Sequence, residues 1–408
     1  MDCIEFTDYW IYNNDTIIIK TLFNDNIDLI NFNDNIISLV FTNFNVIDNA
    51  IKNINNNKYL NIKTYKPSQF NQSINILSLK ILNLTFGYNF NKNIDNLPIN
   101  LQNLTFGNNF NQLVDNLPKT LLNLTFGNNF NQLVNNLPLI IQNLTFGEEF
   151  NQSVDNLPQT LLNLTFGEEF NQSVDNLPQT LLNLTFGSNF NQSVDNLSKS
   201  LQNLTFGNNF NQSVDNLPHL LQNINFGWEF NQNVDNLSKS LQNITFGFSF
   251  NCIVDNLPLN LQNITFGNSF ICSVDNLPNS LKILYFGDSF NQNVDNLPHS
   301  LQNLYFGDSF NQNVDNLPFG MLKLTFSYNF NQQLDNLPNT IITIIFINYP
   351  RCYYDKELNC LPNSILELKL SNNYNQEIKN IPINLKKIVC SSSYKFINKF
   401  NNIDIEFI

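Results

Sequence analysis

The chain has 408 residues and a formal net charge of −13, and 84 residues are asparagine against 20 Lys and Arg together. This acidic balance argues against a nucleic-acid binder or a binder of acidic membranes, because both need clustered basic residues. No run of 18 apolar residues occurs, and Met1–Glu5 lacks the basic and apolar parts of a signal peptide, so neither a membrane span nor secretion is expected. Six cysteines form no disulfide framework, which favours a cytoplasmic location.

Residues 1–69 are predicted to form degenerate coils and an amino-terminal cap. The alternation from Thr16 to Lys20 is typical of a strand, and alternating apolar residues recur at Ile17/Ile19, Ile37/Leu39/Phe41 and Leu60/Ile62. These groups resemble the repeat that follows, but their spacing is irregular.

Residues 70–346 repeat with a period of twenty. Asn-Leu-Pro, or Asn-Leu-Ser in two copies, begins at Asn96 and returns at every twentieth position up to Asn336, which makes 13 copies without an insertion. Phe-Gly likewise recurs from Phe86 to Phe306. A fixed period without drift indicates one structural coil per repeat. Positions twenty residues apart are called a column below, and each column is named after its member in the coil 121–140.

Each coil contains one short predicted strand, Asn123–Gly127 in the reference coil. The apolar residues there alternate with period two, and twenty residues are too few for a helix pair. We therefore predict a mainly β fold, a parallel β-solenoid of 20-residue coils shaped as a rod or a shallow arc, with few or no helices. Gly127 permits a turn that a side chain would hinder. The columns that stay apolar should point inward: Leu121, Leu124, Phe126, Phe130, Val134 and Leu137.

Residues 347–408 are predicted to form degenerate carboxy-terminal coils and a cap. Leu361-Pro362 and Ile381-Pro382 continue the pattern. The spacing from Leu337-Pro338 to Leu361-Pro362 is 24 instead of 20, so about four residues are inserted near Tyr349–Tyr354.

The motif Phe-Asn-Gln-Ser-Val-Asp-Asn-Leu-Pro, followed by Leu-x-Asn-Leu-Thr-Phe-Gly, resembles the FNIP repeat, which is itself similar to leucine-rich repeats. The resemblance implies a leucine-rich-repeat-like solenoid. Such proteins occur in amoebae and in the large DNA viruses that infect them, so a viral chain would work in the host-cell cytoplasm. Many carry an amino-terminal F-box. Residues 1–45 lack its Leu-Pro opening, so a ubiquitin-ligase link is not expected.

Two polar columns invite a chemical interpretation. The Asp column, which runs from Asp95 to Asp335 with Asn135 as its exception, fits a surface turn whose carboxylates accept from backbone N–H groups. A cation-binding array is the alternative, although the Gly-rich ligand loops of calcium-binding repeats are absent. The Asn columns at 131 and 136 are expected to bond between coils. Cys252 and Cys272 share one column and are expected to stay free thiols.

The candidate binding residues are those that break the outward columns. Trp228 and Phe248 stand in the Asn128 column, Tyr285 and Tyr305 replace Thr125, and Glu229 adjoins Trp228. Exposed aromatic residues on a sheet face can dominate a protein interface. Glu148, Glu149, Glu168 and Glu169 form a separate acidic cluster.

We therefore predict a non-enzymatic repeat scaffold that binds an unidentified, basic protein through its sheet face. No cofactor, metal, nucleic acid or membrane is predicted, since His219 and His299 lie in a variable, solvent-exposed column and no catalytic or metal-binding spacing occurs. Two alternatives stay open: a structural or drifting paralogue without a specific partner, and a repetitive polar surface that binds polysaccharide or ice.

Overall fold

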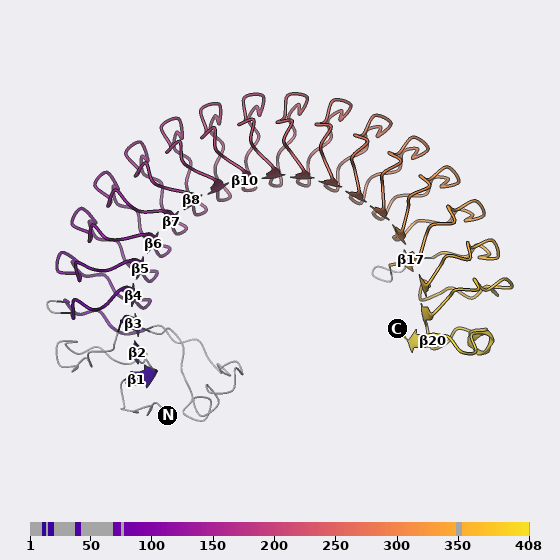
Figure 1. The fold of residues 1–408 in the computed structure, drawn as a ribbon, viewed down its shortest axis with the longest axis horizontal. Helices are drawn as coiled ribbons and strands as arrows, with labels where there is room; N and C mark the ends of the chain where they lie inside the picture. The colour runs from indigo at the N-terminus through magenta and orange to yellow at the C-terminus, as the bar shows by residue number, and fades with distance from the viewer. Residues whose placement is uncertain are drawn as a thin grey trace. The chain divides into compact units, whose positions relative to one another are not determined.

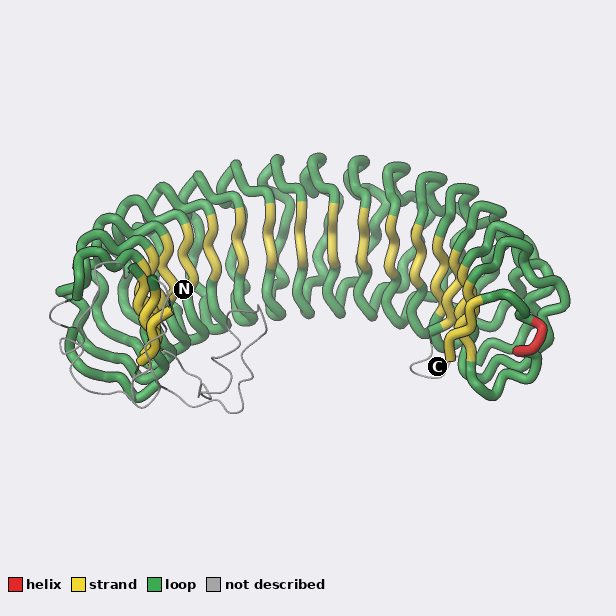
Figure 2. The backbone as a smooth tube through the Cα atoms, turned by 60° about the horizontal axis from the view of Figure 1, so that its bottom comes forward, coloured by secondary structure: helices red, strands yellow, loops and turns green. Residues whose placement is uncertain are grey.

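The computed structural model describes residues 10–13, 15–19, 37–41, 68–74, 77–347 and 353–407. By its internal contacts the chain divides into an amino-terminal unit, Met1–Leu201, and a carboxy-terminal unit, Gln202–Ile408. In each unit, successive coils of backbone place one short strand after another into a sheet (Figure 1). Within the described ranges the only helix is the 3-10 turn η3, Ile397–Lys399 (Figure 2). The predicted parallel β-solenoid is confirmed.

The sheet of the amino-terminal unit follows chain order. β1 pairs antiparallel with β2, and every later neighbour is parallel and in register, as in the pair Asn123↔Asn143. The strands are β1 Trp10–Asn13, β2 Thr16–Ile19, β3 Ser38–Phe41, β4 Asn83–Thr85, β5 Asn103–Thr105, β6 Asn123–Thr125, β7 Asn143–Thr145, β8 Asn163–Thr165 and β9 Asn183–Thr185.

The carboxy-terminal unit repeats the arrangement with parallel pairs throughout. Its strands are β10 Asn203–Thr205, β11 Asn223–Asn225, β12 Asn243–Thr245, β13 Asn263–Thr265, β14 Ile283–Tyr285, β15 Asn303–Tyr305, β16 Lys323–Phe326, β17 Thr343–Phe346, β18 Glu367–Lys369, β19 Lys387–Cys390 and β20 Asp404–Phe407. The last strands thus come from the degenerate part of the sequence, which still adds coils to the same sheet.

The six columns predicted to point inward form the core. In the reference coil Leu121, Leu124, Phe126, Phe130, Val134 and Leu137 are all buried. The Phe126 and Phe130 rings stack on each other with centroids 3.7 Å apart, and each also stacks on its counterpart in the next coil. Aromatic pairs contribute stabilisation beyond their buried area, so the two phenylalanine columns form a continuous stacked core within each unit.

The spacing between coils widens with distance from the sheet. Hydrogen bonding holds neighbouring strands about 4.8 Å apart. The centroid spacing is 5.6 Å between Phe126 and Phe146 and 6.1 Å between Phe130 and Phe150, which lie further along the coil. Phe246–Phe266 and Phe250–Phe270 repeat these values in the carboxy-terminal unit, at 5.6 and 6.1 Å. Each unit taken by itself therefore curves, with its strands on the concave side (Figures 1 and 2).

The strands end two residues earlier than predicted, at Thr125 instead of Gly127. The glycine column explains the early end. A Cβ built on Gly127 would lie 2.2 Å from the carbonyl oxygen of Gly107, because the turns stack directly on one another. No glycine has positive φ among the described residues. Glycine is therefore needed for the close approach of two backbones, which confirms the prediction that a side chain would hinder this turn.

Asparagine side chains link the coils along a second line. The backbone N–H of Asn131 donates to Oδ1 of Asn111 at 3.0 Å, and Nε2 of Gln132 donates to the same oxygen at 2.9 Å. This pattern confirms the predicted inter-coil role of the Asn131 column, because each amide oxygen satisfies a backbone donor of the following coil.

The chain is longer than in a regular coil in two places, between Phe41 and Phe70 and between Phe346 and Tyr354, and each longer segment follows a strand. Phe41 stacks on Phe70 at 4.2 Å, and Phe346 packs on Tyr354 at 4.4 Å, where a regular coil has two residues only four apart. The second longer segment confirms the extra residues predicted near Tyr349–Tyr354. β3 pairs directly with β4. The strand predicted at Leu60/Ile62 lies outside the described residues.

Candidate functional site

The candidate residues occupy two different lines of the coil. Thr125-column residues belong to the strands and face outward, whereas the Asn128 column lies beyond the strand end, in the turn. The prediction that both columns belong to one sheet face was therefore wrong. Tyr285 and Tyr305 lie on the face of the sheet, and Trp228 and Phe248 lie in the turns that follow the strands. The line formed by these turns is called the turn edge below.

Trp228 and Phe248 form the first aromatic pair. Their rings stack at 4.3 Å between centroids with planes 7° apart, and the side chains are 51% and 39% exposed. Glu229 is exposed beside Trp228, and its backbone N–H donates to the carbonyl of Asn208 at 2.8 Å. Exposed aromatic surface of this size, in a column that is polar in most coils, offers a hydrophobic contact point.

Tyr285 and Tyr305 form the second pair. Their centroids are 4.0 Å apart, and the Lys323 ammonium lies 5.3 Å from the Tyr305 ring centroid, within range of a cation–π interaction. Partial burial, followed by hydrogen bonding to Tyr305, raises the pKa of the Tyr285 hydroxyl. Tyr285 is therefore a neutral anchor near pH 7, since an ordinary tyrosine already titrates near pH 10.

One coil separates the two pairs. β13 lies between β12 and β14, and it carries Thr265 and Asn268 at the two positions. Asn268 Nδ2 donates to Asp288 Oδ2 at 2.6 Å, so the turn edge continues from the first pair as a line of polar and acidic residues. The five predicted site residues thus form two neighbouring contact points in one unit.

The face beside the tyrosines holds further apolar residues that the sequence analysis missed. Ile283 replaces asparagine in β14, and Ile345 replaces threonine in β17. Leu322 and Ile342 stand just before β16 and β17, in a column that holds glutamine in some coils and leucine in others. Leu322 and Ile342 are exposed, and Ile283 and Ile345 are half-buried. For Ile283 and Ile345 the signal was the one that singled out the tyrosines, a departure from the usual residue of an outward column, but it was applied only to aromatic residues.

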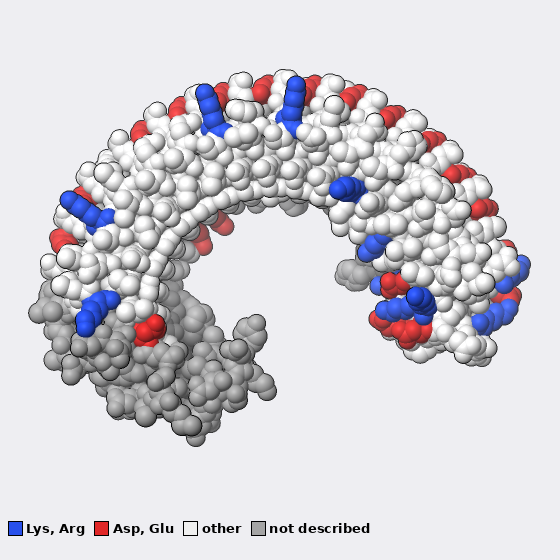
Figure 3. Space-filling model, viewed as in Figure 1, with Lys and Arg blue, Asp and Glu red and all other residues white. Residues whose placement is uncertain are grey.

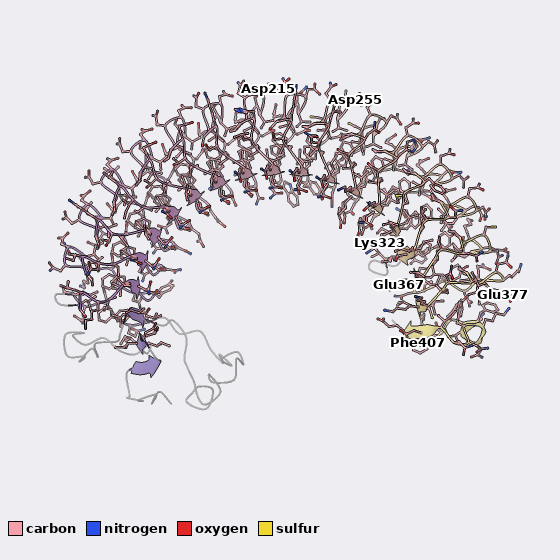
Figure 4. All side chains as sticks on the ribbon, viewed as in Figure 1. Asp215, Asp255, Lys323, Glu367, Glu377 and Phe407 are labelled. Carbon is pink, nitrogen blue, oxygen red and sulfur yellow. The ribbon has the colours of Figure 1, made fainter. Side chains whose placement is uncertain are left out.

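Charged residues lie on both sides of this apolar face. Lys282 and Lys323 stand at the strand starts, and Asp288 and Asp308 stand in the turns after the strands. Figure 4 shows Lys323 and Glu367 on the strand side of the carboxy-terminal unit, opposite Asp215 and Asp255 on its convex side. The concave face of this unit therefore carries charges of both signs, whereas the two labelled residues of its convex side are both aspartates.

Comparison with known proteins supports the repeat assignment. The family model described as FNIP Repeat matches residues 93–129, 271–309, 290–320 and 354–396. The crystal structure of CroV588, a circular leucine-rich-repeat protein, aligns with a TM-score of 0.70 and 32% identity, covering 98% of this chain and 70% of that one. The chain is an FNIP-repeat protein with a leucine-rich-repeat fold.

A second solved structure is similar in fold alone. YopM from Yersinia enterocolitica WA-314 aligns with this FNIP-repeat protein at a TM-score of 0.50 and 18% identity, covering 79% of this chain and 76% of that one. No curated protein matches the sequence.

In each unit of this FNIP-repeat protein, acidic residues follow the convex side (Figure 3), where Asp215 and Asp255 of the Asp column lie in the carboxy-terminal unit. Asp155 Oδ1 accepts from Asn176 Nδ2 at 3.0 Å, and its Oδ2 accepts from Ser153 Oγ at 2.8 Å. Its backbone N–H donates to Ser153 Oγ at 3.4 Å. The surface turn is confirmed, but the expectation that the carboxylates accept from backbone N–H groups was wrong, because side chains supply the donors.

These donors stabilise the ionised carboxylates. Hydrogen bonds from Asn176 and Ser153 hold the pKa of Asp155 below its ordinary value, and bonds from Asn116 and Asn93 do the same for Asp95. In the reference coil Asn136 Nδ2 donates to Asp115 Oδ1 at 3.0 Å. The Asn136 column therefore links coils as predicted, and in the reference coil it does so through the aspartate.

The remaining candidates stay separate from the aromatic pairs. Cys252 and Cys272 are free thiols, and each donates to the Asn131-column oxygen of the preceding coil, at 3.2 and 3.4 Å. Burial is the main cause that raises the pKa of both thiols. The charge of Cys272 adds a smaller increase for Cys252, and the charge of Asp255 adds one for Cys272. Cys360 lies in the Asn136 column beside Asp335, and Cys352 lies outside the described residues.

The acidic cluster belongs to the amino-terminal unit. Glu148, Glu149, Glu168 and Glu169 are all exposed, and Asn189 Nδ2 donates to Glu169 Oε2 at 3.0 Å. His219 and His299 are exposed, as predicted. The described part of the chain contains no group of three metal-ligating side chains. Nor does any helix within it have the length and apolar character needed to cross a bilayer.

Proposed function

We propose that this FNIP-repeat protein is a non-enzymatic scaffold that binds another protein through the concave face and adjoining turn edge of its carboxy-terminal unit. The proposal rests on one observation: the two stacked pairs, Trp228–Phe248 and Tyr285–Tyr305, present exposed aromatic surface in columns that are polar in most coils. Leucine-rich-repeat proteins commonly serve as interaction scaffolds, which is consistent with this role.

The four aromatic residues should contribute more binding energy than the columns that are the same in most coils. Interface energy concentrates in a few large side chains, and aromatic residues are enriched among them. In contrast, the Asn123 column is already bonded along the sheet, each amide donating to the one before, as Asn143 donates to Asn123. Such asparagines gain little from a partner because their hydrogen bonds are already made.

Acidic residues near the pairs favour a basic partner. Glu229, Asp288 and Asp308 lie along the turn edge that carries Trp228 and Phe248. Charges at the rim of an interface raise the association rate more than the final affinity. A basic partner should therefore associate more slowly as salt increases, while the aromatic contacts continue to hold the complex.

The test compares proteins captured by the native chain and by a quadruple variant, Trp228→Asn, Phe248→Asn, Tyr285→Thr and Tyr305→Thr. The matched control changes the equivalent positions of the amino-terminal unit: Asn108→Ala, Asn128→Ala, Thr165→Ala and Thr185→Ala. Quantitative mass spectrometry should show partners lost from the quadruple variant and kept by the control. Equal recovery from all three proteins would contradict the proposal and favour a structural role without a specific partner.

A further inference from the structure

The apolar residues of the concave face form a row that crosses the strands. The row comprises Ile283, Tyr285, Tyr305, Leu322, Ile342 and Ile345. Register places Tyr285 opposite Tyr305 and Thr325 opposite Ile345, so the row advances by one coil at a time from β14 to β17. An occupant of this row must therefore run along the stack of coils, perpendicular to the strands.

The coil spacing favours a helix as the occupant. Neighbouring coils are about 4.8 Å apart at the strands. A helix lying along the row brings one side chain to it per turn, every 5.4 Å or so, and drifts by about 2 Å over three coils at the strand spacing. At the 4.0 Å spacing of the Tyr285 and Tyr305 ring centroids the drift is about 4 Å. An extended segment places successive side chains of one face about 6.7 Å apart and drifts by roughly 6 to 8 Å over the same three coils. The repeat of a helix is therefore the closer match to the coil spacing.

Charges of opposite sign flank the row. Lys282 and Lys323 form the lysine rim at the strand starts, and Asp288 and Asp308 form the aspartate rim in the turns after the strands. The lysine rim comes from the coils of β14 and β16, and the aspartate rim comes from the coils of β14 and β15. Lys282 shares its column with Leu322 and Ile342, and Lys323 shares its column with Ile283. A helix lying over Tyr285 and Tyr305 would therefore have lysines and aliphatic residues along its strand-start side and aspartates along the other side.

The rim charges are available to a partner. Lys282 Nζ donates to the neutral Gln262 at 3.4 Å, and Lys323 lies over the Tyr305 ring. Asp288 accepts from Asn268, and Asp308 accepts from Ser327. Within the described part of the chain none of these four residues forms an ion pair, in contrast to Lys387, which pairs with Glu406 at 2.7 Å. No ion pair within the described residues therefore compensates the charges of the two rims.

We propose that the partner presents an amphipathic helix to this row, with an apolar stripe, an acidic flank against the lysine rim and a basic flank against the aspartate rim. The inference rests on the proposed function and adds the shape and charge pattern of the partner. In this proposal only one flank of the binding helix needs to be basic, instead of the partner as a whole.

Three synthetic peptides of about 18 residues, roughly five helical turns, provide the probe. All carry the same leucine stripe, and their flanks are one Glu and one Lys side, two Lys sides, or two Glu sides. Fluorescence anisotropy of labelled peptides measures binding to the full chain. The native chain should bind the mixed peptide about tenfold more tightly than either uniform peptide, because a uniform peptide places like charges against one rim.

Charge reversal on the protein should change the preferred peptide. The variant Lys282→Glu/Lys323→Glu has two acidic rims and should prefer the peptide with two Lys flanks. The variant Asp288→Lys/Asp308→Lys has two basic rims and should prefer the peptide with two Glu flanks. Lys239→Glu lies away from the row and is the control, which should keep the native preference. An unchanged order of affinities in the reversed proteins would overturn the proposal.

Two further measurements keep the result interpretable. The neutral variant Asp288→Asn/Asp308→Asn changes little in shape and should lose the preference for a Lys flank even if the lysine substitutions disturb folding. A mixed peptide with a central proline tests the helix and should bind about tenfold more weakly, since proline breaks the helix. Equal binding of the proline peptide, or no binding of any peptide to the native chain, would overturn the helix proposal. The capture experiment above would still decide the proposed function separately.

Discussion

The outward columns of the two units differ, although their coils share one core. From β4 to β9 every strand of the amino-terminal unit reads Asn-Leu-Thr, and the asparagines bond to one another along the sheet. From β11 onward the strands of the carboxy-terminal unit depart from this sequence, with Tyr285, Tyr305 and Lys323 among the replacements. The phenylalanine stacking keeps the same distances in both units, 6.1 Å for Phe150–Phe170 and for Phe230–Phe250.

The difference separates two requirements on the sequence. The inward columns must stay constant, because each coil packs only against its neighbours and a change would disturb the stack. The outward columns are free to change without affecting the fold. The carboxy-terminal unit uses that freedom to expose aromatic and aliphatic residues, and the predictions below test whether the two requirements are independent.

Deletions of a whole coil and of half a coil should show the largest difference in folding. Deletion of Leu161–Thr180 in the uniform region, or of Leu281–Ser300 in the aromatic region, removes one coil in register and should leave a cooperatively folded protein. Deletion of Leu161–Phe170 removes half a coil and should prevent folding of the unit, because core residues would then meet turn residues. Circular dichroism and thermal melting distinguish these outcomes. Only the Leu281–Ser300 deletion should also reduce partner capture, and equal stability of half-coil and whole-coil deletions would contradict the solenoid.

Two phenylalanines that lie two residues apart should show the next largest difference, in the free energy of unfolding lost on replacement by alanine. Phe250 is fully buried and Phe248 is 39% exposed. Phe250→Ala should lower the free energy of unfolding by about 3–5 kcal/mol, the cost of an emptied aromatic core site. Phe248→Ala removes only an exposed stack and should cost about 1 kcal/mol or less. Urea unfolding of both variants checks the difference, and similar values would mean that the assignment of inward and outward columns is incorrect.

The glycine column should be intolerant of even one methyl group. A Cβ on Gly167 would lie 1.9 Å from the Gly147 carbonyl oxygen, so Gly167→Ala should cost about 1–3 kcal/mol through crowding of the backbone. Gly320→Ala is the matched control, because its Cβ would first meet the His299 carbonyl oxygen at 3.0 Å. Thermal unfolding should show a clear loss only for the first variant. A neutral Gly167→Ala would show that neighbouring turns can separate at little cost.

Acid should weaken the aspartate turns slightly. The pKa values of Asp95 and Asp155 are lowered in the folded chain, so their contribution to stability is present above pH 3.8 or so and is lost as the pH falls through the lower folded values. Asp95→Asn/Asp155→Asn should be nearly neutral at pH 7, since Asn135 already serves as acceptor for Asn156 at 3.2 Å. Melting temperatures between pH 5 and 2 should fall less steeply for the double variant. A steeper fall would contradict this assignment.

The sequence alone predicted much of the fold because the repeat leaves few choices. Once Phe126 recurs every twenty residues, in-register pairing places all of its copies on one line, and an apolar line must be buried. The candidate site was only partly predictable. Trp228 and Tyr285 were recognised as departures from their columns, but their separation into an edge pair and a face pair depended on where the strand ends.

The sequence by itself determined the period, the inward columns and the predominance of strands, because these follow from spacing and hydrophobicity along one chain. The tertiary structure decided where each strand stops, how each unit curves and which outward residues meet. The stacking of Gly127 on the Gly107 carbonyl ends the strand at Thr125 and places the Asn128 column in the turn. The row from Ile283 to Ile345 arises because hydrogen bonding aligns four successive coils, which brings together residues up to 62 positions apart in the sequence.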